Sequence, residues 1–294
     1  MRARKTAAVV GVGATMVLGS LMTAGATDLP RASVLPSLSA DRVLDIARVD
    51  ALPEGVGLEI HADFPADAPL MLDGLAINSL TADLTPDGGV IVRGAHALAA
   101  ESSAAGVDEC DDPAFIPTGV KWAADTMPIG WYLDIASVPE EIKAPRTVLT
   151  VRTAHRIWPR AQSRCGGRDN IHFSYDYLGH KSDKPDPDNV NIIDFGRLGG
   201  NALAVNYTWY RGAREIFDVD LRLNKFDYLW TNLANVNRFN VRNVVAHELG
   251  HQFGLDDLGS PHTSLTMYGL IGRGEVNKAT LGRGDIRGAE RLSP

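Results

Sequence analysis

The stretch VVAHELGHQFGLDD, residues 244–257, decides how the larger part of this chain is expected to fold and act. His247 and His251 are four residues apart, so a helix places them on the same face, one above the other. Two imidazoles in this arrangement can bind one metal ion, and Glu248 lies beside them, able to accept a proton. The stretch therefore predicts the centre of a metal-dependent hydrolase. The alternative is a surface helix with two solvated histidines.

The residues that follow the helix motif support a metal site. Gly254 comes three positions after His251 and can end the helix in a left-handed conformation. Asp257 comes six positions after His251 and adds a carboxylate, which is an established zinc ligand. Neutral imidazole suits zinc, and three protein ligands leave one position for a water whose pKa the metal lowers toward about 7.

The composition indicates a globular, acidic protein. The chain has 294 residues, a formal net charge of −7 and an ordinary hydrophobic fraction of 45%. Basic residues form no cluster that would favour nucleic acid as a partner, and a negative charge of this size mainly favours solubility. The length suits one large domain or two small ones.

Residues 1–26 have the pattern of a secretory signal peptide. Basic residues at positions 2, 4 and 5 precede an apolar run, and small residues at positions 24–26 form a cleavage site. The alternative is an uncleaved membrane anchor. We expect cleavage, and therefore a secreted, extracellular protein without a membrane attachment, whose net charge without the leader is about −10.

Two cysteines, Cys110 and Cys165, are present, and an even number in an exported chain favours one disulfide bond. Such a bond closes a loop of roughly 55 residues, for which chain entropy predicts about 4 kcal/mol of stabilisation. The alternative is a thiolate that blocks the metal in a latent form. Neither cysteine lies in a sequence typical of such a blocking peptide, so we expect the disulfide.

Residues 27–106 are predicted to form a small strand-rich segment ahead of the main domain. Their short apolar runs are separated by turn residues and lie at 56–60, 70–75 and 90–92. We expect a propeptide or an accessory surface domain, with residues 95–106 as a linker. His61 and His96 stand alone here, and we expect both at the surface rather than at a metal.

All Trp and Tyr residues lie after position 107, where the main core is expected. The predicted strands cover residues 129–135, 170–175, 191–195, 203–209 and 215–223. The last of these alternates apolar and charged residues, which predicts a place near the sheet edge with Asp218 and Asp220 facing solvent or an ion. Pro145 opens a predicted helix, and His155 recurs on its apolar face, as a core histidine would.

The stretch between Tyr177 and Val190 is dense in Asp and Pro, which predicts a loop. Its candidate ligands for calcium or a second zinc are His180, Asp183, Asp186 and Asp188. Their spacing fits no defined calcium loop, so we expect a solvated loop and keep Ca²⁺ as the alternative.

Several further stretches accompany the helix motif in order along the chain. They are CDD at 110–112, GVKW at 119–122, NIIDFG at 191–196, LA at 203–204, VDLRLN at 219–224, LTMY at 265–268 and LGRGDIRG at 281–288. With H-E-x-x-H-x-x-G-x-x-D, they make residues 107–294 resemble the matrixin branch of the metzincin metalloproteases, in a form similar to secreted actinobacterial enzymes. The resemblance implies an α+β fold: a twisted mixed, mostly parallel sheet with an antiparallel edge strand, two main helices and a C-terminal helix.

The resemblance also implies roles for individual residues. One catalytic Zn²⁺ is expected on His247, His251 and Asp257, with Glu248 as the general base that hydrolyses peptide bonds. Met267 matches the methionine beneath the metal in the family's Met-turn, and Tyr268 and Gly254 are expected to support the site. The expected partner is a protein or peptide substrate lying antiparallel to the edge strand, and the expected state is a monomer.

One departure from the family concerns the third metal ligand. Most matrixins have His where this chain has Asp257, and Asp there resembles the snapalysin type of metzincin. His262 is the competing third ligand, but its register is less favourable, and Asp256 is expected to be exposed. A second hypothesis is an exported, metal-stabilised binding module with a degenerate protease site, in which a fourth protein ligand closes the metal. A third is an amidase that acts on cell-wall peptides.

Overall fold

The computed structural model describes residues 38–72, 75–97, 106–166 and 170–294. The predicted signal peptide and most of the predicted linker lie outside the described residues. From Leu35 onward the chain forms one unit by its contacts. None of the helices in the described part has the length and apolar character needed to cross a membrane.

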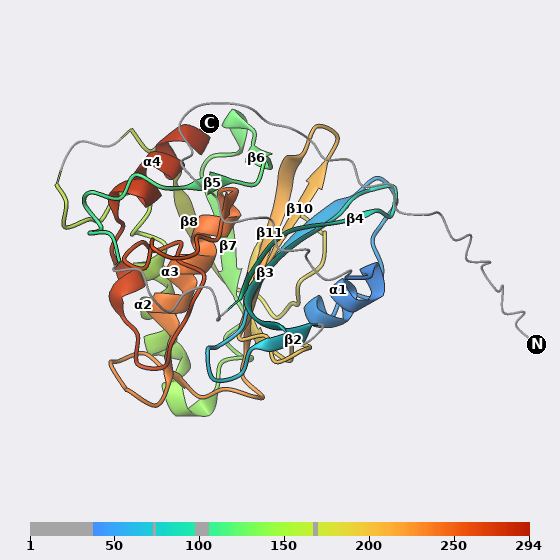
Figure 1. Ribbon diagram of the computed structural model, residues 1–294. Coiled ribbons are helices and arrows are strands. Elements are labelled where there is room, and N and C mark those ends of the chain that lie inside the picture. Colours follow the sequence, from blue (N-terminus) through green and yellow to red (C-terminus); the bar gives the residue numbers. More distant parts are fainter. Residues whose placement is uncertain (1–37, 73–74, 98–105, 167–169) are drawn as a thin grey trace, which may run out of the picture. The chain divides into compact units, whose positions relative to one another are not determined.

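Four α-helices lie in the described ranges (Figure 1): α1 (Ala40–Ala47), α2 (Ala144–Ala154), α3 (Val241–Gln252) and α4 (Arg283–Leu292). The strands are β1 (Gly57–Asp63), β2 (Leu70–Leu72), β3 (Leu75–Leu84), β4 (Val90–Ala97), β5 (Ile116–Pro117), β6 (Lys121–Trp122), β7 (Ile129–Leu133), β8 (Tyr175–His180), β9 (Ile192–Gly196), β10 (Ala204–Arg211), β11 (Glu215–Asn224), β12 (Trp230–Thr231), β13 (Phe239–Asn240) and β14 (Leu255–Asp256).

The main sheet has the strand order β2-β3-β1-β10-β11-β9-β7-β8. Strands β7, β8, β9 and β11 pair in parallel, whereas β10 runs antiparallel to β11 and to β1. The fold is therefore α+β with a mixed sheet. The resemblance implied an antiparallel edge strand, but the antiparallel strand β10 lies inside the sheet. β1 from the N-terminal segment pairs with it along seven residues, from Gly57 opposite Tyr210 to Asp63 opposite Ala204.

The structure corrects two predictions about the strands. β11 lies inside the sheet, and Asp218 and Asp220 are fully buried rather than facing solvent. Asp220 accepts hydrogen bonds from the backbone N–H of Ile192 at 2.9 Å and from the indole of Trp209 at 3.1 Å. The strand predicted at 170–175 instead begins at Tyr175, where the chain first pairs with β7.

Part of the predicted loop 177–190 therefore belongs to β8, which ends at His180. The remainder carries an ion-pair cluster in which the ammonium of Lys181 lies 2.6 Å from Asp183 and 3.7 Å from Asp188. Since a lysine already balances these carboxylates, nothing in their geometry favours calcium over a solvated loop.

Two separate hydrophobic cores lie on opposite faces of the sheet. The larger core is formed with α2 and α3, and its buried residues all come from Val120 onward. The smaller core lies beneath α1, and most of its buried residues lie between Val43 and Leu84, with Tyr207 and Trp209 of β10 completing it. Figure 1 shows α1 and α3 on either side of β10.

Two further predictions are confirmed. Cys110 and Cys165 form a disulfide, with their Cα atoms 5.1 Å apart. His155, at the end of α2, is 4% exposed; its ring stacks on Trp131 at 3.8 Å, and Nδ1 lies 2.9 Å from the carbonyl oxygen of Val151. Burial lowers the pKa of His155 to about 3, so it is a neutral core residue.

Candidate metal centre

Local residues determine where helix α3 begins and where it ends. The Asn240 side chain accepts a hydrogen bond from the backbone N–H of Asn243 at 3.1 Å and caps the helix start. Gly254 ends the helix with φ +91, and an added Cβ there would lie 2.7 Å from the carbonyl oxygen of Val120. Glycine is therefore required at this position by both its conformation and the close approach of the neighbouring chain.

Both histidines of α3 are oriented by backbone carbonyls. Nδ1 of His247 lies 2.6 Å from the carbonyl oxygen of Thr266, and Nδ1 of His251 lies 2.8 Å from that of Leu255. Each Nδ1–H donates to its carbonyl, which leaves the Nε2 lone pairs for a metal. The two Nε2 atoms are 3.2 Å apart, so both can bind the same metal ion.

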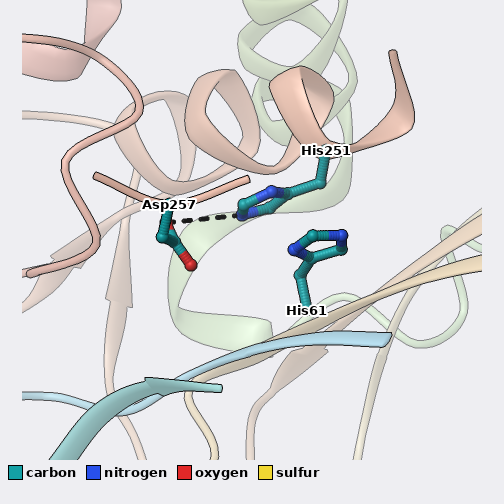
Figure 2. A group of neighbouring side chains, drawn as sticks. All are labelled: His61, His251 and Asp257. Carbon is teal, nitrogen blue, oxygen red and sulfur yellow. Dashed lines mark ion pairs between the residues drawn. The ribbon is translucent and has the colours of Figure 1, made fainter. Parts of the chain in front are cut away.

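Asp257 completes this arrangement from the chain beyond α3. Its Oδ1 lies 3.1 Å from Nε2 of His247 and 3.7 Å from Nε2 of His251, and its Oδ2 accepts a hydrogen bond from Ser79 at 2.5 Å. Figure 2 shows Asp257 directed at the ring of His251. The competing residue, His262, turns away, because its Nδ1 pairs with Asp112 at 2.8 Å.

Glu248 lies on the same helix and is fully buried. Among the described residues, no N–H or O–H group donates a hydrogen bond to either of its carboxylate oxygens. Burial raises the pKa of Glu248, and the neighbouring carboxylate of Asp63 raises it further. A buried carboxylate without a donor costs stability unless it serves a reacting group or an ion, so its placement favours a functional role.

Asp63 and His61 of β1, which were not predicted from the sequence as site residues, reach the centre. Oδ2 of Asp63 lies 3.2 Å from Nε2 of His247. The ring of His61 stacks on that of His251 at 3.9 Å, and Figure 2 shows His61 rising from β1 to this ring. The prediction of a surface His61 is wrong, because β1 packs beside β10 and buries it. The side chain of His96 lies outside the described part.

Asp256 is also buried, at 8% exposure, which corrects the expectation that it is exposed. The cause is again the N-terminal segment: β3 covers this turn, and the hydroxyl of Thr81 donates a hydrogen bond to Oδ1 of Asp256. Alternation in β1 was the signal for these contacts, since residues 57–63, GLEIHAD, place Glu59, His61 and Asp63 on one face.

The electrostatics favour positive charge where the Nε2 atoms meet. Burial lowers the pKa of His247, but the carboxylate of Asp63 and the hydrogen bond to Asp257 outweigh it and raise that pKa to about 10. Burial, followed by repulsion from His61, lowers the pKa of His251. Two imidazole nitrogens beside carboxylate oxygens form a donor set suited to zinc. Two overlapping groups offer such atoms within 4.8 Å of one another: His61, His251 and Asp257, and Asp63, His247 and His251.

The floor of the centre is held by the turn after Asp257 and by α4. Met267 is 1% exposed and lies against Gly250 of α3, where even a Cβ would meet its sulfur atom. Asp285, a residue missed in the sequence, accepts hydrogen bonds from the backbone N–H groups of Thr266 at 2.9 Å and Met267 at 3.1 Å. Thr266 in turn holds His247, so α4 orients a candidate ligand through this turn.

Tyr268 is buried, at 7% exposure, and its backbone oxygen accepts a hydrogen bond from the ammonium of Lys278. The same ammonium lies 5.4 Å from the centre of the Tyr268 ring. These contacts give Tyr268 a packing role. A further group of candidate ligand atoms, at Glu109 and the two cysteines, is not a metal site, because both sulfur atoms are in the disulfide.

No model of a known protein family matches the sequence, and a search of curated proteins found no match. The functional argument therefore depends on the geometry of the centre and on the motifs that supply it.

Proposed function

We propose that this protein is a secreted zinc-dependent endopeptidase of the metzincin type. The observation that carries the proposal is the convergence of His247 Nε2, His251 Nε2 and Asp257 Oδ1, with separations of 3.1, 3.2 and 3.7 Å. Buried Glu248 beside them supplies the proton acceptor that hydrolysis needs. The signal-peptide pattern and the disulfide support an extracellular location.

Each residue has a distinct part in the proposed reaction. His247, His251 and Asp257 would hold the zinc, which when bound lowers the pKa of water and stabilises negative charge on the scissile carbonyl. Glu248 takes a proton from the attacking water and passes it to the leaving amine, a contribution of about 10²–10⁴ in rate. Asp285 and Met267 keep the turn beneath His247 in place.

The substrate would be an extended peptide lying antiparallel to β10. This strand runs antiparallel to β11, and its other side pairs antiparallel with β1 in this structure, so a substrate strand would take the side that β1 occupies, and main-chain hydrogen bonds would supply affinity. Since α3 contacts β10, the backbone of a polypeptide bound there would lie beside the candidate metal ligands of α3.

A second function is favoured by one specific observation, the approach of Asp63 to His247. A carboxylate that stays there permanently would give the metal four protein ligands, as in structural zinc sites. The protein would then be an exported binding module stabilised by its metal. This alternative predicts a bound zinc and no cleavage of any polypeptide under any condition.

The test compares the zinc-loaded parent protein with Glu248→Gln. Cleavage of casein by both proteins is measured with and without 1,10-phenanthroline, before and after brief treatment with pancreatic elastase, which cuts after small residues such as those at 97–105 and is then blocked with a serine-protease inhibitor. We expect the parent to cleave casein in a chelator-sensitive manner and the variant to bind zinc but lose at least 100-fold in rate. Equal activity of the two proteins, or none from a parent with stoichiometric zinc, would contradict the proposal.

A further inference from the structure

A pocket of about 430 Å³ lies between residues 160–166 and helix α4, beside the disulfide bond. A cavity of this size is within the range of sites that hold small ligands. Three arginines line it, Arg160, Arg283 and Arg287, together with one carboxylate, that of Glu290. These arginines form no cluster in the sequence, because Arg160 precedes Arg283 by more than a hundred residues. None of the lining residues belongs to the candidate metal centre, so the pocket is a separate feature.

The two walls of the pocket are fixed to each other by a covalent bond and a backbone contact. The disulfide attaches the wall that contains Cys165 to the turn at Cys110. That turn is held to α4, because the backbone N–H of Arg283 donates a hydrogen bond to the carbonyl oxygen of Glu109 at 2.8 Å. The pocket is therefore formed without a ligand, and binding would cost little ordering of the chain.

The lining of the pocket is positively charged, although the chain as a whole has a formal net charge of −7. Its one carboxylate, on Glu290, already accepts a hydrogen bond from the backbone N–H of Asn170 at 2.9 Å. Among the described residues, none of the ion pairs involves the three lining arginines. Arg164 beside the pocket differs, since it lies 3.9 Å from Glu109. The three lining guanidiniums can therefore bind an anion from solvent.

Arginines also recur along the outer face of α4. Arg283, Arg287 and Arg291 are exposed and four residues apart, so they form a row in which neighbours lie about 6 Å apart along the helix axis. The opposite face of the helix is buried, through Gly284, Asp285, Gly288 and Ala289. Like charges at this spacing repel, and Arg283 in the first turn also opposes the helix dipole. The row thus weakens the helix on its own and becomes favourable beside negative charge.

The kind of cation and its arrangement indicate the kind of anion. A guanidinium presents its N–H donors in a planar fork that matches the oxygens of phosphate or sulfate, whereas a lysine offers a point charge. Arg291 continues the row beyond the pocket, so a chain of anionic groups fits better than a single ion. None of the described residues that line the pocket is aromatic, so nucleic-acid bases would have no ring to stack on there.

We propose that this pocket and the arginine row of α4 bind the phosphate or sulfate groups of a linear anionic polymer. Arg160, Arg283 and Arg287 hold the groups that enter the pocket, and Arg291 holds the next group along the polymer. The inner face of α4 supports the turn beneath His247, so a polymer on the outer face leaves the candidate metal centre untouched. Binding retains the protein on such a polymer, and the inference holds whether or not the proposed function is correct.

The first test measures the binding of fluorescein-labelled inorganic polyphosphate to the full chain by fluorescence anisotropy. The parent is compared with Arg283→Gln/Arg287→Gln. The control, Arg152→Gln/Arg156→Gln, removes the same charge from two exposed arginines that are also four residues apart. We expect binding to weaken at least about tenfold in the first double variant and less than about twofold in the control. No binding by the parent, or equal weakening in both double variants, would overturn the proposal, because attraction by net charge needs no site.

The salt dependence of the same binding reports the number of charged contacts. For a flexible phosphate chain the slope of log K against log salt concentration is about −0.7 for each neutralised phosphate, so the four proposed contacts predict about −3 for the parent. Arg283→Gln/Arg287→Gln should then give about −1.4, and the control the slope of the parent. A slope that this double variant leaves unchanged would contradict the proposed contacts.

Competition with unlabelled polymers identifies the anionic group. Polyphosphate and dextran sulfate should each displace the probe, and the one that does so at lower concentration identifies phosphate or sulfate as the preferred group. Polyglutamate carries carboxylates in a row and should need at least about tenfold more for the same displacement. Equal displacement by polyglutamate would refute the recognition of phosphate or sulfate.

Chemical modification of the parent is a test that needs no variant to fold. Phenylglyoxal modifies exposed guanidiniums, and the modified positions are identified by mass spectrometry with and without polyphosphate. We expect polyphosphate to slow the modification of Arg160, Arg283 and Arg287 at least about fivefold, while Arg152 and Arg156 react as before. Equal protection of all five arginines, or protection of none, would overturn the proposal.

Discussion

Arg214, in the turn between β10 and β11, is the cation that fastens the N-terminal segment to the sheet. Its guanidinium lies 2.8 Å from Glu59 of β1 and also binds Asp83 of β3, and both carboxylates are fully buried. Tyr210 donates a further hydrogen bond to Asp83 at 2.6 Å. Arg214→Ala removes this cation and leaves two buried carboxylates without it.

The size of the effect follows from the burial of the pair. Breaking a buried ion pair costs about 3–5 kcal/mol, and because the Arg214 side chain is 25% exposed, we expect about 2–3 kcal/mol. Since 1.4 kcal/mol is tenfold in an equilibrium, the population with an undocked segment rises about 30- to 150-fold. The loss should fall on the docking of the segment rather than on the larger core, to which neither carboxylate belongs.

Hydrogen exchange measured by mass spectrometry checks this prediction. Amides of β1 and β3 should exchange about 30- to 150-fold faster in Arg214→Ala, while those of α3 keep their protection. Arg211→Ala is the matched control, since Arg211 ends the same strand and its guanidinium lies 3.7 Å from the centre of the Phe217 ring. Unchanged exchange in β1, or equal acceleration in β1 and α3, would refute a separately docked segment.

Two further predictions concern stability. His155 has a folded pKa of about 3, below its unfolded value of about 6.5, so only the unfolded chain takes up its proton between these values and stability falls with pH in that window. Between pH 7 and pH 5 the free energy of unfolding of the parent, measured in urea, should therefore fall by about 2 kcal/mol more than that of His155→Phe. Equal falls would contradict a buried neutral histidine. The control is His172→Gln, at an exposed position, which should behave as the parent. The double variant Cys110→Ser/Cys165→Ser lacks the bond that joins residues 55 positions apart, and its free energy of unfolding should be about 2–4 kcal/mol lower. Its melting temperature should then be roughly 10 °C lower than that of the parent. An unchanged melting temperature would contradict a stabilising role of the disulfide.

The centre of the candidate site could be predicted because its determinants are local. Spacing alone places His247 and His251 on one face of α3, and a single glycine turn brings Asp257 back to them. The choice of Asp257 over His262 also depends on short-range register, and the structure brings Asp257 within 3.1 Å of His247. The disulfide and the core position of His155 are confirmed, whereas the metal ligands stay a prediction.

What the sequence did not reveal depends on contacts far apart in the chain. The pairing of β1 with β10 joins residues more than a hundred positions apart, and nothing local in either strand names its partner. Because that pairing was missed, His61 and Asp256 were expected at the surface. The burial of Asp218 also depends on a contact from another part of the chain, the hydrogen bond that the backbone N–H of Asn189 donates to its carboxylate. Without knowledge of that donor, alternating apolar and charged residues indicate a half-exposed strand.

The role of Asp285 depends on a similar long-range contact. It lies at the start of α4, where an acidic residue is ordinary because it favours the helix terminus. Its carboxylate also accepts hydrogen bonds from the backbone of Thr266 and Met267, nearly twenty residues earlier. The sequence alone predicts that Asp285 caps a helix, and its support of a candidate metal ligand becomes visible only from the position of α4 beneath this turn.

The proposed function depends on a single ion held at the point where α3 and the following turn meet. A crystal of the zinc-loaded full chain, measured at the zinc absorption edge, shows that ion by its anomalous scattering. We predict one strong peak bound by His247, His251 and Asp257. A structure with zinc elsewhere, or with the two histidines turned apart and no peak between them, would contradict the account.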